Sequence, residues 1–93
     1  MFVIEDEAHA EWQGEFRTRE QALAELKRRA SIPWNEPPNQ APCTNWPKCG
    51  RRYELIDFDD SALPWTELTR TLILEISAAG VLWHGPQADA PIV

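Results

Sequence analysis

The cysteines and histidines are the residues whose types come nearest to a known chemical site. Cys43 and Cys49 have five residues between them, and Cys49 is followed by glycine, two arginines and a tyrosine, a context typical of zinc knuckles. Structural zinc takes four ligands, usually from closer cysteine pairs, so His9 or His84 would have to complete the set. Reduced thiols in a packed loop are the simplest interpretation. A zinc-stabilised module and a loop-closing disulfide are the alternatives.

No other combination of side chains forms a recognised catalytic set. The C-x-x-C spacing of redox sites is absent, and no glycine-rich oxyanion loop accompanies a cysteine and a histidine. The carboxylates cluster at 5–7 and 57–60, but neither cluster has the spacing of a calcium-binding EF-hand loop. We therefore expect a non-enzymatic protein with no catalytic residues. Zinc is the one cofactor that the sequence leaves open.

Four arginines stand in two short basic groups. Arg28 and Arg29 end a helical pattern, and Arg51 and Arg52 begin a strand pattern. If the fold brings the groups together, they form a local positive patch for an anion, an acidic partner or RNA. The formal net charge of −6 repels phosphate backbones, however, and disfavours nucleic acid as the general partner.

Tryptophan and proline give the strongest indication of a binding role. The chain has five tryptophans, and Trp34 and Trp46 lie in a segment without periodicity, residues 32–50, that also holds five of the eight prolines. Aromatic residues in loops are typical of interfaces, although they also enlarge small cores. The leading hypothesis is a protein-interaction or regulatory module with an unknown protein partner, which uses this loop.

The elements that must position these residues begin with a predicted hairpin. Phe2-Val3-Ile4 favours a strand, and the alternation over residues 11–17 predicts a second strand, with the turn near residues 6–9. In that alternation Trp12, Gly14 and Phe16 share one face. A helix then follows over residues 18–31, with Thr18 as N-cap and Gln21 as its capping-box partner.

The second half of the chain carries both strand and helix patterns. Residues 52–58 predict a third strand with apolar residues on both faces. Residues 64–79 fit helical spacing, with Pro64 near the start and Gly80 as a C-cap, and we predict a helix there. The run of β-branched residues from Thr71 to Ile76 supports a strand as the alternative. Residues 81–83 should be extended.

Together these elements predict one α+β domain over residues 1–84, in the order β-β-α-loop-β-α, with a small antiparallel sheet packed on one or two helices. Residues 85–93 are predicted to be a flexible tail. A homodimer would cover the edges of so small a sheet. The sequence shows neither a secretory leader nor an apolar run that reaches across a bilayer, so we expect a cytoplasmic protein without membrane contact.

Overall fold

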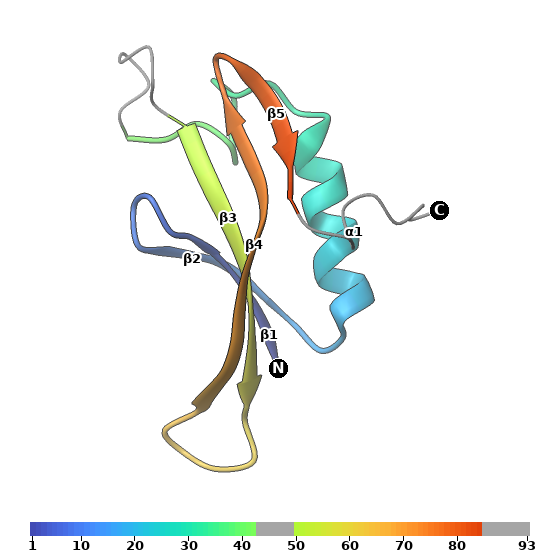
Figure 1. Cartoon of the computed structure of the whole chain (residues 1–93), viewed down its shortest axis with the longest axis vertical. Coiled ribbons are helices and arrows are strands. Elements are labelled where there is room, and N and C mark those ends of the chain that lie inside the picture. Colours follow the sequence, from blue (N-terminus) through green and yellow to red (C-terminus); the bar gives the residue numbers. More distant parts are fainter. Residues whose placement is uncertain (43–49, 85–93) are drawn as a thin grey trace.

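The computed structural model describes residues 1–42 and 50–84. These residues form one helix and five strands, which are labelled in Figure 1. In chain order they are β1 (Phe2–Asp6), β2 (Glu11–Phe16), α1 (Arg19–Ala30), β3 (Gly50–Asp59), β4 (Thr66–Ser77) and β5 (Gly80–Trp83). The strands make one antiparallel sheet in the order β2-β1-β3-β4-β5. The predicted α+β class with a small antiparallel sheet is confirmed.

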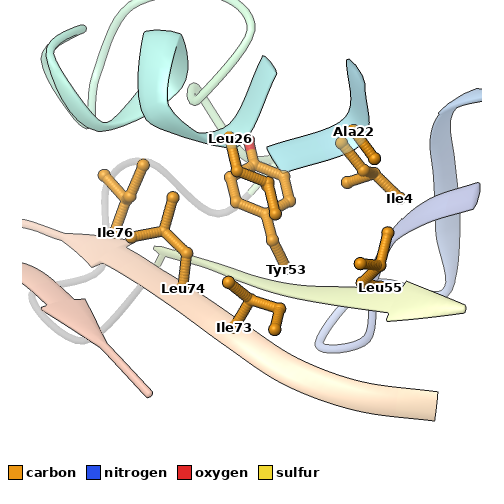
Figure 2. Close-up of a cluster of buried hydrophobic side chains, with 8 residues drawn as sticks. All are labelled: Ile4, Ala22, Leu26, Tyr53, Leu55, Ile73, Leu74 and Ile76. Carbon is orange, nitrogen blue, oxygen red and sulfur yellow. The ribbon is translucent and has the colours of Figure 1, made fainter. Parts of the chain in front are cut away.

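The hydrophobic core lies between α1 and one face of the sheet. Ala22 and Leu26 of the helix are completely buried and meet side chains from β1, β3 and β4, as Figure 2 shows. The strands contribute Ile4, Tyr53, Leu55, Ile73, Leu74 and Ile76. Each fully buried aliphatic side chain stabilises the fold by roughly 1.5–3 kcal/mol. The opposite face of the sheet is called the helix-free face below.

The helix begins as the sequence predicts. The hydroxyl of Thr18 accepts a hydrogen bond from the backbone N–H of Gln21 at 3.1 Å, which satisfies one of the free donors of the first turn. The Gln21 side chain accepts from the N–H of Arg17, one residue before the expected capping-box position. The predicted boundaries, 18–31, differ from the observed helix by the two capping residues, Thr18 and Ser31.

The prediction of a helix over residues 64–79 is wrong. Thr66–Ser77 is strand β4, which pairs with β3 along its whole length and buries Ile73, Leu74 and Ile76. The helical spacing had placed Leu68 on the apolar stripe, yet 57% of it is exposed. The long neighbouring strand β3 explains the outcome, because it offers a ladder of backbone groups and β-branched residues suit a pleated surface.

The single apolar face predicted for Trp12, Gly14 and Phe16 is also wrong. The β1–β2 register shifts between Ile4, which pairs with Gly14, and Glu5, which pairs with Trp12. The bulge inserts one extra residue, Gln13, and so turns Trp12 to the face opposite Phe16. Phe16 packs against the core, whereas Trp12 projects from the helix-free face.

The connection after α1 is fastened to the core by a buried asparagine. The Asn39 amide donates to the backbone carbonyls of Arg29 and Ile32, both at 2.8 Å, and its oxygen accepts from the Tyr53 hydroxyl at 2.9 Å. Trp34 is partly buried against the core cluster. Trp46, which the sequence prediction uses as a second anchor of this loop, lies outside the described residues, as does the predicted tail 85–93.

β3 extends two residues beyond its predicted start and one beyond its predicted end, and it occupies the centre of the sheet. This position explains its apolar residues on both faces, because Leu55 faces α1 and Ile56 is completely buried on the other side. The predicted extended segment at 81–83 is strand β5. Over the described ranges, no helix has the length and apolar character that a membrane span requires.

Candidate binding surface

Three aromatic rings gather on the helix-free face. Two of them belong to the end of β3 and to the residue before the start of β4, where these strands extend beyond α1 in Figure 1. Trp12 stacks on Trp65 with ring centroids 6.3 Å apart and an interplanar angle of 20°. Phe58 lies tilted against both, with centroids 5.6 Å from Trp12 and 5.7 Å from Trp65. These three residues are called the aromatic face. It joins β2, β3 and the residue preceding β4.

The backbone and one hydrogen bond hold the Trp12 ring in place. The bulge at Gln13 directs Trp12 to this face, and its indole N–H donates to the Glu5 carboxylate at 3.1 Å. In spite of these contacts 51% of Trp12 stays exposed. Burying an indole gains a large apolar area, so a half-exposed and oriented tryptophan is typical of a surface that a partner covers.

A hollow of about 450 Å³ adjoins the aromatic face. Its lining comprises Trp12, Glu15, Phe58, Leu63 and Trp65. Leu63, in the turn between β3 and β4, is 85% exposed and extends the apolar surface. The volume falls within the roughly 300–1,000 Å³ of ordinary ligand clefts. The combination of apolar walls with one carboxylate suits an amphipathic group, one that joins an apolar part to a positive charge.

The helix-free face carries more acid than base. Arg70 lies among three carboxylates there, bonded to Glu54 at 2.7 Å, to Glu67 at 2.9 Å and to Glu5 at 3.2 Å. The hydrogen bonds that Arg70 donates, to Glu67 first and then to Glu54 and Glu5, raise the pKa of its guanidinium above the ordinary value. Arg70 is therefore occupied by the protein's own acidic groups.

A second charged cluster is buried at the C-terminal end of β1. Asp6 is completely buried and accepts from Arg51 at 2.8 Å, from a ring nitrogen of His9 at 2.6 Å and from the backbone N–H groups of Ala8 and Arg52. Arg51 also bonds Glu11 and the backbone carbonyl of residue 40. Burial opposes the charge on Arg51, but the bonds from Asp6 and Glu11 outweigh it and raise the guanidinium pKa.

This cluster has a structural role in the fold. Arg51 joins the start of β3 to the end of β1, and its Nε is buried with no hydrogen-bond partner among residues 1–42 and 50–84. The Arg51 side chain is only 8% exposed.

The two arginines predicted at the end of the helix are bonded to a carboxylate of the helix itself. Arg28 and Arg29 both bind Glu25, at 2.7 and 2.6 Å, and the bonds from Arg28 lower the pKa of that carboxyl to about 2. Arg29 also bonds Gln13 and lies over the Tyr53 ring. Arg28 thus supports the helix alone, and Arg29 supports both the helix and its contact with the sheet.

Arg52 is the most exposed of the pair that begins β3. It bonds Glu7 at 2.9 Å and Glu75 at 3.3 Å, with 47% of its side chain exposed. Arg51 is enclosed with Asp6 and Glu11 as described above. The structure therefore brings each predicted basic residue to a carboxylate.

The two candidate histidine ligands also bond to carboxylates. His9 meets Asp6, and His84 meets Glu75 with its Nε2 at 2.6 Å. Among residues 1–42 and 50–84, no group of three or more metal-ligating side chains converges. Cys43 and Cys49 lie outside these ranges, so the zinc module stays a prediction, and elemental analysis of the purified protein tests it.

Sequence reasoning missed Trp12 and Phe58 as surface residues. A signal was present, because both are aromatic residues set between polar neighbours: Trp12 between glutamate and glutamine, and Phe58 between two aspartates. The pattern was interpreted as half-buried strand. Trp34, a predicted binding residue, packs partly buried against the core.

Comparisons with protein-family models, with curated proteins and with solved structures find no match for this chain.

Proposed function

We propose that this chain is a non-enzymatic protein-interaction module that binds its partner through the aromatic face. One observation carries the proposal: Trp12 and Trp65 are stacked on the helix-free face, with about half of Trp12 exposed. Tryptophan is among the residues that contribute most to binding energy at interfaces, and clustered exposed apolar surface marks such sites.

The way the rings are held supports the same proposal. The Trp12 ring is oriented by a hydrogen bond to Glu5 and by contact with two other aromatic residues. A partner that covers oriented rings loses little side-chain entropy on binding, because the rings are ordered beforehand. The exposed Leu63 borders the same surface and enlarges its apolar area.

The experiment compares binding by Trp12→Ser and by Leu82→Ser with binding by the wild type. Leu82 is the matched control, since it is 56% exposed but belongs to β5 rather than to the aromatic face. Partners are captured with the wild-type chain, identified and purified, and their affinities are then measured by titration calorimetry. Circular dichroism and urea unfolding establish that each variant is folded.

We expect Trp12→Ser to weaken binding by about 2 kcal/mol, roughly 30-fold in Kd, because the indole would be a central anchor. Leu82→Ser should bind as the wild type does. The proposal fails if the purified partner binds Trp12→Ser with unchanged affinity, or if both variants weaken binding equally.

A further inference from the structure

The hollow at the aromatic face is open to the solvent and combines two kinds of wall. Trp12, Phe58 and Trp65 supply ring surfaces, and Glu15 supplies a carboxylate. Ring faces attract cations through their quadrupole, and tryptophan does so most strongly. A carboxylate beside such rings adds a direct charge partner. An arginine or lysine side chain can contact the ring faces and the carboxylate at the same time.

Glu15 is available for such a partner. It lies on β2 opposite Val3, which places it on the helix-free face with Trp12, and it is exposed. Within the described part of the chain, Glu15 has no ion-pair partner, whereas the nearby Glu5 is engaged by Trp12 and Arg70. Glu15 is thus the carboxylate of this hollow that remains open to an incoming cation.

The charge of the whole face favours the same kind of occupant. By strand register, the helix-free face carries five glutamates and two arginines, namely Glu5, Glu15, Glu54, Glu67, Glu75, Arg52 and Arg70. Both arginines are already bonded to glutamates. The face therefore presents excess negative charge, which steers a basic partner toward it.

The same excess argues against the other occupants. A second copy of the chain would bring an identical acidic face, and like charges across an interface cost affinity. Nucleic acid would bring phosphates to a face on which the two arginines of the strands, Arg52 and Arg70, are already bonded to glutamates. A basic protein segment is the occupant that the rings and the charges both fit.

We propose that the hollow between Trp12, Phe58 and Trp65 receives an arginine side chain from a basic protein partner, with Glu15 as its charge partner. Arginine suits the site better than lysine, because its planar guanidinium stacks on aromatic faces while it bonds a carboxylate. This inference rests on the proposed function and specifies the chemistry of the partner.

The test uses the full chain and a defined probe, the blocked peptide acetyl-Gly-Arg-Gly-amide. The matched neutral probe carries citrulline in place of arginine, which keeps the shape and removes the charge. Binding is followed in ¹H–¹⁵N spectra through the indole N–H signals of Trp12 and Trp65. Glu15→Gln is the test variant, and Glu20→Gln, on the exposed first turn of α1, is the control.

The arginine peptide should shift both indole signals saturably, and the citrulline peptide should not. Glu15→Gln should weaken binding of the arginine peptide roughly two- to fivefold in Kd, the size of an exposed charge contact. Glu20→Gln should leave this Kd unchanged. The inference is overturned if the two peptides give equal shifts or if neither gives a shift. It is also overturned if the arginine peptide binds the two variants with equal affinity.

The two proposals fail separately. If Trp12→Ser loses the purified partner but the arginine peptide does not bind, the interaction module stands and the arginine site is wrong. If the partner binds Trp12→Ser as tightly as the wild type, the proposed function is wrong, whether or not the arginine peptide binds. Light scattering of the free protein completes the test. If the protein self-associates and Trp12→Ser abolishes the association, a second copy is the occupant, and the proposal of a basic partner is overturned.

Discussion

Asp6 illustrates how one buried residue connects distant parts of this chain. Its carboxylate is completely enclosed and accepts bonds from Arg51, His9 and two backbone N–H groups. A buried charge is tolerated only when it is paired and hydrogen-bonded, and removing one member leaves the other uncompensated. Asp6 therefore holds the end of β1 against the start of β3.

Asp6→Asn should destabilise the fold by roughly 3 kcal/mol or more, because it leaves the buried Arg51 guanidinium without its main countercharge. Urea unfolding followed by circular dichroism measures the change in the free energy of unfolding. Asp57→Asn, on a half-buried aspartate of β3, is the matched control and should stay within about 0.5 kcal/mol of the wild type. A loss below about 1 kcal/mol in Asp6→Asn would show that the cluster contributes little.

At the scale of elements, β4 and the β1–β2 bulge decide which residues reach the surface. β4 pairs with β3 from Thr66 to Ser77, and its register shifts twice along the way. The strand places Trp65 beside Phe58, and the bulge in β2 brings Trp12 onto both. A helix at 64–79 would have removed this surface altogether.

The start of β3 is packed too closely against β4 to accept a side chain at Gly50. A Cβ there would lie 2.4 Å from the carbonyl oxygen of Ile76 and 2.7 Å from the Cβ of Ser77. Because a backbone atom is involved, the strands themselves would have to separate. We expect Gly50→Ala to cost about 1–3 kcal/mol in the free energy of unfolding, measured in urea. Unchanged stability would contradict this β3–β4 pairing at Gly50.

At the scale of the molecule, charge is distributed so that each predicted basic residue is paired. Arg28 and Arg29 bind Glu25, Arg51 binds Asp6, and Arg52 binds glutamates on either side. With a net charge of −6, the protein offers acidic rather than basic surface to its surroundings. The predicted anion-binding patch would require these pairs to open.

We therefore expect no mobility shift of a short RNA or of duplex DNA in the presence of the protein, even at low ionic strength. Phosphate binding depends on cations that release counterions, and these four arginines are engaged by carboxylates. A gel-shift titration over a range of salt concentrations measures this. A shift that weakens as salt rises would revive the nucleic-acid hypothesis.

Local sequence by itself determined the elements whose signals lie within a few residues. The hydroxyl of Thr18 caps the helix that follows it, and the alternation around Gly14 produces a strand, because capping and strand patterning depend on near neighbours. The α+β class and the first hairpin were predictable for the same reason.

Tertiary structure alone decided the type of β4, the direction of Trp12 and the pairing of the arginines. Residues 66–77 carry both helical and strand signals, and the ladder offered by β3 selects the strand. The Gln13 bulge follows from register against β1, and Arg51 meets Asp6 across 45 positions of chain. Such outcomes depend on contacts between segments that are far apart in sequence, so no local pattern could have specified the aromatic face.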